Sequence, residues 1–192
     1  MKIGVLAIQG DFAEHVAMLR RLGVAAVEVR LPLHLEGLNG LILPGGESTT
    51  IGKLAVDFGL IDPLRDFSRS QAIWGTCAGA IFLSRDARRS QPLLNIMDIT
   101  VQRNAFGRQV DSFEADLDIE ALNLATQSST PYHAIFIRAP IIDSVFGEAR
   151  VLSALPDGRI VAAQQGKILA TSFHPELTSD TRFHEFFLTL AG

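Results

Sequence analysis

The sequence contains a single cysteine, Cys77, and this scarcity limits what the chain can be. One thiol cannot close a disulfide within the chain, and so low a use of cysteine is typical of a reducing cytoplasm, where we expect the protein to act. The histidines and acidic residues are dispersed, without the spacing of a metal centre. The sequence therefore predicts no disulfide framework and no metal site.

Long apolar runs and an excess of positive charge are lacking as well. No apolar stretch approaches the roughly 20 residues that cross a bilayer. Met1 to Asp11 read as a strand and turn rather than as a signal peptide. The formal net charge of −4 gives no electrostatic reason to bind nucleic acid or a membrane surface. With 192 residues, 47% of them hydrophobic, the chain can bury a core as one domain, residues 1–192.

The first half of the chain alternates apolar runs with amphipathic segments. We expect strands at Lys2–Ile8, Ala26–Val29, Gly40–Leu43 and Ala72–Trp74. We expect helices between them, at Asp11–Gly23, Thr50–Phe58 and Pro63–Phe67, the first with Asp11 and Glu14 as a capping box. This alternation predicts right-handed crossovers and a parallel sheet covered by helices on both faces.

The second half is richer in strands. Strands are expected at Ile99–Gln102, Ala134–Ile137, Val151–Leu155, Arg159–Ala163 and Ile168–Ser172, and a last helix at Thr181–Leu190. Asp157-Gly158 and Gln165-Gly166-Lys167 indicate hairpin turns between neighbouring strands. The predicted fold class is α/β: a single three-layer domain with a mostly parallel twisted sheet, helices on both faces and antiparallel hairpins in the second half.

The one cysteine lies in the pentapeptide Gly75-Thr76-Cys77-Ala78-Gly79, directly after the apolar run Ala72-Ile73-Trp74. A strand that ends in a glycine-flanked nucleophile and opens into a helix makes a sharp turn, which pushes the reactive side chain out of the sheet. The N–H groups that begin such a helix favour a thiolate. A lone cysteine is more often a small buried apolar residue, but the flanking glycines favour a nucleophile here.

A nucleophilic thiol needs a base, and the sequence offers one histidine in a suitable setting. His174 follows the strand at Ile168–Ser172, and Glu176 stands two positions further on. In an extended segment both side chains emerge on the same side, so the carboxylate can hold the imidazole in one tautomer. The alternative for His174 is a surface histidine at a strand end. Its presence in the same chain as the Cys77 turn favours a catalytic role.

Acyl transfer also needs donors for the developing oxyanion. One candidate is the backbone N–H of Ala78, and the other is the turn formed by Gly45 and Gly46 after the strand at Gly40–Leu43. In an open parallel sheet both lie at the carboxyl edge, where ligands bind. A purely structural turn is the alternative for Gly45-Gly46. A phosphate loop is disfavoured because no Gly-Lys-Ser/Thr follows.

Several segments spread along nearly the whole chain combine into one pattern. They are Ile8-Gln9-Gly10-Asp11 with Glu14-His15, Leu43 to Thr50, Trp74 to Gly79, Arg103 to Glu114, Phe136 to Pro140, and Ser172 to Glu176. Together they resemble the class I (triad) glutamine amidotransferases and, within that class, the glutaminase family of pyridoxal 5'-phosphate synthase. The Cys77 turn and the His-x-Glu motif are common to the class, whereas Arg103 to Glu114 and Ile137 to Pro140 are specific to the vitamin B6 family.

The resemblance implies that the chain hydrolyses L-glutamine to L-glutamate and ammonia. Cys77 would attack the side-chain amide, and His174 and Glu176 would complete the triad. It also implies a glutamine site made of Gly46, Glu47, Ser48, Arg103, Ile137 and Arg138. An arginine suits the substrate's α-carboxylate, since its planar fork pairs with that group in a bidentate manner.

The resemblance further implies a partner, a (β/α)8-barrel synthase subunit that uses the ammonia to make pyridoxal 5'-phosphate in a hetero-oligomeric complex. Gln9, Gly10, Glu14 and His15 resemble the region that meets this partner. Docking is expected to order the oxyanion turn. Pyridoxal phosphate would be the product of the complex, so no cofactor is expected for this chain.

Three other readings stay open on the sequence alone. A class I glutaminase that serves another synthase would share the chemistry, and co-purification with a barrel synthase separates the two. A cysteine hydrolase of related fold would cleave peptides or γ-glutamyl bonds instead of free glutamine. A non-catalytic binding subunit could keep the fold as a scaffold, although Cys77, His174 and Glu176 are all present.

Overall fold

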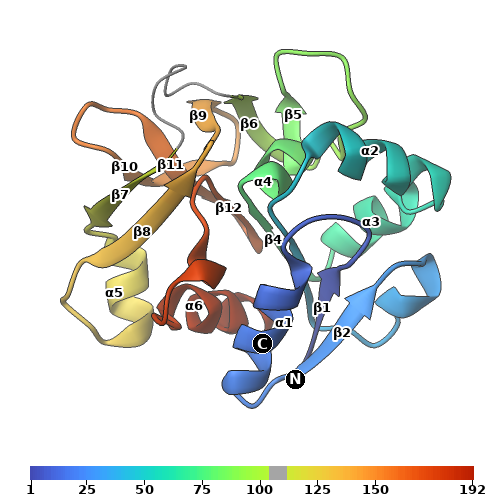
Figure 1. Cartoon of the computed structure of the whole chain (residues 1–192), viewed down its shortest axis with the longest axis horizontal. Helices are drawn as coiled ribbons and strands as arrows, with labels where there is room; N and C mark the ends of the chain where they lie inside the picture. The colour runs from blue at the N-terminus through green and yellow to red at the C-terminus, as the bar shows by residue number, and fades with distance from the viewer. Residues whose placement is uncertain (104–111) are drawn as a thin grey trace.

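A computed structural model describes residues 1–103 and 112–192 of the chain (Figure 1). Strands and helices alternate through its first half, as the sequence predicts. In chain order the elements are β1 (Lys2–Leu6), α1 (Phe12–Arg21), β2 (Ala25–Val29), the 3₁₀ turn η1 (Pro32–Leu35), β3 (Gly40–Leu43), α2 (Ser48–Asp57), α3 (Ile61–Ser68), β4 (Ala72–Thr76) and α4 (Ala78–Leu83). Each expected strand and helix of this half is present, with ends shifted by a few residues.

The second half adds mainly strands. Its elements are β5 (Ser84–Asp86), β6 (Met97–Gln102), β7 (Ser112–Leu117), α5 (Glu120–Thr126), β8 (Tyr132–Ile137), β9 (Ile141–Val145), β10 (Arg150–Ala154), β11 (Ile160–Gln165), β12 (Ile168–Thr171), the 3₁₀ turn η2 (Pro175–Leu177) and α6 (Arg182–Ala191). The sequence did not predict β5, β7, β9 or α5. Both expected hairpins are confirmed, because β11 pairs antiparallel with β10 and with β12.

The main sheet joins a parallel half to an antiparallel half. Its strand order is β2-β1-β3-β4-β12-β11-β9-β6-β5, with β10 paired to β11. The strands from β2 to β12 run parallel, and β11, β9 and β6 pair antiparallel. The strands β7 and β8 form a separate two-stranded sheet. The mixed α/β fold predicted from the sequence is confirmed.

Both faces of the parallel half are buried, which explains why its strands are almost wholly apolar. Successive residues of β3 alternate between two cores: Leu41 and Leu43 pack on one face and Ile42 on the other. The first face is covered by α2, α3 and α4, and the second by α1, α5 and α6 together with β7 and β8. The three layers seen in Figure 1 follow from this alternation.

Helix capping differs from the sequence prediction at the start of α1. Asp11 is the N-cap residue, but its side chain makes no capping hydrogen bond. The expected Asp11–Glu14 capping box is therefore wrong, and the Asp11 carboxylate lies in the site described below. Among the helices of the described ranges, none has the length and apolarity needed to span a bilayer.

Candidate active site

Cys77 occupies the sharp turn between β4 and α4. Its backbone is left-handed, with φ of 48°, and its N–H donates to Thr171 O at the end of β12, 2.8 Å away. A side chain at Gly79 would collide with the carbonyl oxygen of Leu43, and one at Gly75 would collide with Gly79. Both glycines are required because β4, α4 and β3 approach so closely, and this packing holds the strained Cys77 backbone in place.

His174 reaches the same edge of the sheet from the neighbouring strand. The parallel pairing of β12 with β4 brings Thr171 opposite Thr76, so the segments that follow both strands lie together. The His174 backbone N–H donates to Ile135 O of β8 at 2.8 Å, which fixes the segment after the strand. His174 and Cys77 line the same cavity, and their interaction contributes most to raising the pKa of His174. The structure thus brings together two residues that the sequence places 97 positions apart.

Glu176 holds the other side of the imidazole. Its Oε1 lies 2.7 Å from Nδ1 of His174, and both side chains are buried. Since Nδ1 faces the carboxylate, Nε2 is left to face the thiol, which is the arrangement of a catalytic triad. Burial raises the pKa of the Glu176 carboxyl, and its hydrogen bond with His174 partly offsets that rise.

The charge state of His174 follows from its two partners. Burial alone would lower its pKa, but the hydrogen bonds with Cys77 and then with Glu176 outweigh it and raise the pKa of His174 to about 10. The imidazole therefore stays protonated at neutral pH. An imidazolium beside a thiol stabilises the thiolate and is ready to donate a proton to a leaving group.

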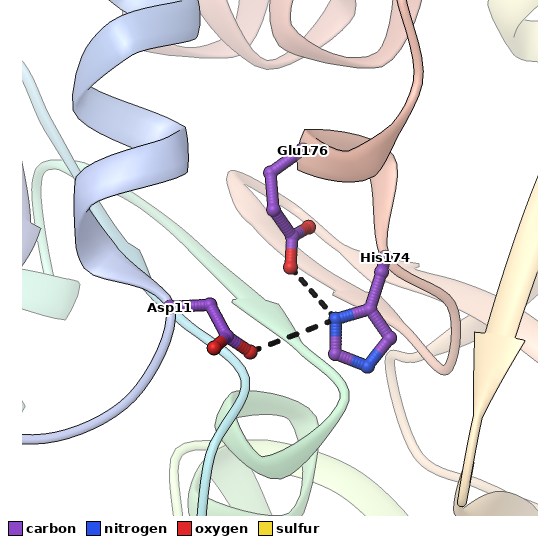
Figure 2. A group of neighbouring side chains, drawn as sticks. All are labelled: Asp11, His174 and Glu176. Atoms are coloured by element: carbon purple, nitrogen blue, oxygen red, sulfur yellow. Dashed lines mark hydrogen bonds and ion pairs between the residues drawn. The ribbon is translucent and has the colours of Figure 1, made fainter.

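A second carboxylate, that of Asp11, approaches the same imidazole (Figure 2). Its Oδ2 lies 3.9 Å from Nδ1 of His174, on the side also taken by Glu176. Within residues 1–103 and 112–192, these three side chains form the one group with metal-ligating atoms close together, within 4.8 Å. A metal there would take Nδ1 away from Glu176, so the arrangement suits a triad with an additional negative charge better than a metal site.

The predicted oxyanion turn packs against the loop after β1. The Gly45 carbonyl accepts a hydrogen bond from the Asp11 N–H at 3.1 Å, and Gln9 Oε1 accepts one from the Glu47 N–H at 2.8 Å. A side chain at Gly10 would collide with the Gly45 carbonyl oxygen, and one at Gly46 would collide with Gln9. Gly46 also has φ of 149°, which disfavours other residues. Two close approaches therefore fix this turn beside Cys77.

The Ala78 backbone N–H follows the nucleophile directly in the chain. Ala78 is the first residue of α4, and the first N–H groups of a helix have no acceptor within the helix. A donor of this kind can stabilise a developing oxyanion next to the nucleophile. The geometry is compatible with the role expected for Ala78 from the sequence.

A cavity of about 580 Å³ opens at this edge of the sheet. Most of the residues singled out in the sequence line it: Gln9, Gly10, Glu14, Gly46, Glu47, Ser48, Cys77, Ala78, Arg103, Ile137, Arg138 and His174. Glu176 and Gly45 lie behind this lining, in contact with His174 and Asp11 respectively. A cavity of this volume accommodates an amino acid beside the thiol.

One wall of the cavity carries an ion pair. Arg103 Nη2 lies 2.5 Å from Oε1 of Glu47, whose other carboxylate oxygen caps α2 by accepting from the N–H groups of Thr49 and Thr50. Desolvation opposes ionisation of Glu47, but the hydrogen bonds from Thr49, Thr50 and Arg103 prevail and lower its pKa to about 2. The wall thus presents a fixed carboxylate and a guanidinium, which match the α-ammonium and α-carboxylate of an amino acid.

Another part of the cavity lining comes from the end of β8. Ile137 is partly exposed, and Arg138 has a left-handed backbone with φ of 43°. The same sheet that positions His174 through Ile135 therefore also positions these two residues.

Residues 104–111, which include most of the Arg103 to Glu114 motif, lie outside the described residues.

One residue expected at a partner interface is not at the surface. His15 is fully buried, so a partner could meet its helix but not its imidazole. The cause is the amphipathic face of α1, on which His15 lies one turn before the buried Leu19. Glu14 is exposed at the cavity rim, while Gln9 and Gly10 support the oxyanion turn.

The sequence reasoning missed some of the cavity lining. Asp11, Ile81 and Leu177 line it, and none was assigned to the site from the sequence. The position of Asp11, directly after Gln9-Gly10, was a usable signal. Ile81 and Leu177 are apolar residues of α4 and η2, and apolar character alone does not separate a cavity wall from the core.

The parallel sheet, the strained cysteine turn and the buried His–Glu pair define the class of triad glutamine amidotransferases. A family model for the SNO glutamine amidotransferase family matches residues 5–191. The chain belongs to the SNO glutamine amidotransferase family.

Similar proteins match this chain over nearly its full length. The pyridoxal 5'-phosphate synthase subunit PdxT of Herpetosiphon aurantiacus is 56% identical, with 99% of this chain and 100% of the relative covered. The subunit of the same name from Deinococcus radiodurans is 55% identical, with 100% and 98% covered. A crystal structure of a glutamine amidotransferase superposes with a TM-score of 0.92 at 50% identity, covering both chains completely.

Proposed function

We propose that this chain is the glutaminase subunit of pyridoxal 5'-phosphate synthase and that Cys77, His174 and Glu176 carry its chemistry. The Cys77 thiolate attacks the side-chain amide carbon of L-glutamine, and the resulting oxyanion is stabilised by the Ala78 N–H and the Gly45-Gly46 turn. His174 donates its proton to the amide nitrogen, the C–N bond breaks, and ammonia leaves a γ-glutamyl thioester on Cys77.

The second half of the reaction reuses the same groups. His174, now neutral, takes a proton from a water molecule as that water attacks the thioester carbonyl. The carbon–sulfur bond breaks, L-glutamate is released, and the imidazolium–thiolate pair is restored. Glu176 keeps Nδ1 of His174 protonated throughout and stabilises the imidazolium, as the 2.7 Å contact between the two side chains supports.

Substrate recognition is assigned to the charged wall of the cavity. Glu47 would bind the α-ammonium group of glutamine, and Arg103 with Arg138 would bind its α-carboxylate. Ser48, Gly46 and Ile137 would complete the pocket. The lining of the cavity by these residues beside Cys77 supports the assignment.

The ammonia would pass to a (β/α)8-barrel synthase subunit in a hetero-oligomeric complex. Free ammonia is protonated in water near neutral pH and is then no longer a nucleophile, so a partner has to receive it directly. The family and the synthase-subunit relatives support such a partner. A cytoplasmic location belongs to the same proposal, because Cys77 has to remain a reduced thiol to act.

The observation that carries the proposal is the buried contact of Glu176 with His174, whose other nitrogen faces Cys77. The test is ammonia release from L-glutamine by the wild type and by Cys77→Ala, each mixed with the barrel synthase subunit. Cys77→Ala should abolish ammonia release and leave partner binding nearly intact. Wild-type-like turnover by Cys77→Ala would remove Cys77 from the mechanism.

A further inference from the structure

A pair of buried histidines lies directly behind the triad. His15 comes from α1 and His184 from α6, and neither is exposed to solvent. Nδ1 of His15 lies 3.0 Å from Nε2 of His184. On its other side, Nε2 of His15 lies 3.4 Å from Oε2 of Glu176 and 3.3 Å from Oγ1 of Thr76. A continuous row of polar side chains therefore runs from α6 through α1 to the catalytic carboxylate.

The second carboxylate oxygen of Glu176 needs a partner. Oε1 is used by His174, while Oε2 is buried and has no hydrogen bond of regular geometry within the described residues. Leaving a charged oxygen buried and unpaired is costly. The side chain that approaches it is His15, and a small adjustment of the 3.4 Å contact would make Nε2 its hydrogen-bond donor.

Both histidines are neutral, which limits each to one ring proton. Burial, the neighbouring His184 and then His174 lower the pKa of His15 well below its usual range. Burial, with a smaller contribution from Arg21, lowers the pKa of His184 to about 3. The hydrogen bond between them therefore has one donor and one acceptor, and its direction decides which nitrogen of His15 carries the proton.

Two considerations indicate the same donor for the hydrogen bond between His184 and His15. Nδ1 of His184 is buried without a partner among the described residues, and a buried N–H without an acceptor costs more than an unused lone pair. The His184 proton therefore belongs on Nε2, which donates to Nδ1 of His15. The His15 proton then belongs on Nε2, facing Glu176; the opposite tautomer would set a lone pair against the carboxylate.

We propose that His15 is a positioning residue of the glutaminase site, whose Nε2–H holds the second carboxylate oxygen of Glu176, and that His184 fixes the tautomer of His15. The inference rests on the proposed function. A neutral donor satisfies Glu176 without neutralising it, so the carboxylate remains free to stabilise the His174 imidazolium. Thr76 Oγ1 shares the same N–H as a second acceptor.

The kinetic test compares two substitutions of His15 in the chain mixed with its synthase partner. His15→Leu removes the donor and should lower kcat for glutamine hydrolysis by about 10- to 100-fold, with KM changed less than about twofold. His15→Gln keeps an N–H near the position of Nε2 and should recover most of kcat. Equal losses in both variants, or wild-type kcat in His15→Leu, would overturn the proposal.

Leu19→Ala is the matched control. Leu19 lies on the same buried face of α1, one turn beyond His15, and its side chain has no polar atom that could take part in the hydrogen bonds of His15, His184 and Glu176. It should reduce stability while leaving kcat per folded molecule unchanged. A kcat loss in Leu19→Ala equal to that in His15→Leu would show that disturbed helix packing, not a lost donor, explains the effect.

The tautomer can be read without any activity. In the wild-type chain labelled with ¹⁵N-histidine, the His15 Nε2 resonance should be that of a protonated nitrogen and the Nδ1 resonance that of an unprotonated one. The reverse would overturn the proposal, even if His15→Leu failed to fold. Should the wild type release no ammonia from glutamine, the proposed function fails, while the proton position on His15 is still decided by this spectrum.

Discussion

Two histidines of this chain meet a carboxylate at the same distance, in opposite surroundings. Nδ1 of His174 lies 2.7 Å from Glu176, and Nδ1 of His133 lies 2.7 Å from Asp116. The first pair is 6% and 0% exposed, and the second is 53% and 69% exposed. The contact distance alone therefore does not make a catalytic site. Burial, a thiol on the second nitrogen and a cavity distinguish the first pair.

The two pairs also differ in what holds them. His174 follows β12 and is tied by its backbone to β8, while Glu176 stands on η2 against α1. His133 lies on the outward face of β8, and its second nitrogen contacts another exposed carboxylate, that of Glu114. Ion pairs in such exposed positions are screened by water and contribute little. The comparison predicts large effects at one pair and none at the other.

Removing each imidazole gives the largest expected difference. His174→Ala should lower glutamine hydrolysis at least about 10³-fold, because both the proton donor and the partner of the thiolate are lost. His133→Ala should hydrolyse glutamine at the wild-type rate. Initial rates of ammonia release in the presence of the synthase subunit measure both. Comparable losses in the two variants would contradict the distinction between the buried pair and the exposed pair.

Neutralising each carboxylate gives a smaller effect of the same kind. Glu176→Gln keeps the shape of the side chain but removes the charge that stabilises the imidazolium, so kcat should fall by about 10²-fold. Asp116→Asn is the matched surface substitution and should leave kcat unchanged. If Glu176→Gln retains full kcat, the carboxylate does not act on the reaction through His174.

The pH dependence of stability gives the smallest expected difference. The pKa of His174 is raised to about 10 in the folded chain, so the folded state holds a proton that the unfolded state releases above about pH 6.5. The stabilisation is complete below pH 6.5 and is lost as the pH rises through about 10. The free energy of unfolding should therefore fall across this window.

Urea unfolding at a series of pH values tests this sign. His174→Gln should flatten the fall in stability between pH 6.5 and 10, since it removes the group that binds the additional proton. His133→Gln should leave the slope as in the wild type, because that side chain is exposed and its charge is screened. A free energy of unfolding that rises with pH in the wild type between pH 6.5 and 10 would contradict the protonated state of His174.

The sequence predicts the local parts of this site well. The turn at Cys77 was recognisable because Gly75 and Gly79 are needed where β4, α4 and β3 make close contact. The pairing of His174 with Glu176 was expected from their spacing in an extended segment; the contact is present at 2.7 Å, although Glu176 lies in the 3₁₀ turn η2 and not in an extended segment. In both cases the signal lies within a few residues of chain.

Contacts between distant segments were the part that sequence patterns did not predict. Asp11 has the spacing of a capping residue, yet its carboxylate lies near His174 in the fold. His15 reads as a polar residue beside Glu14, but α1 turns it inward onto Glu176 and His184. The strand β7 was missed because it is covered on one face only and has no continuous apolar run.

The central claim is that Cys77 forms a covalent bond to the substrate beside the His174–Glu176 pair. Rapid acid quenching of the enzyme during turnover of L-glutamine, followed by mass spectrometry of the peptides, tests it most directly. The account predicts a γ-glutamyl group on the Cys77 peptide of the wild type and no such group in Cys77→Ala. When deacylation is slow, the γ-glutamyl enzyme accumulates in place of free enzyme. Ammonia release at the full rate with no adduct on Cys77, or with an adduct on another residue, would contradict it.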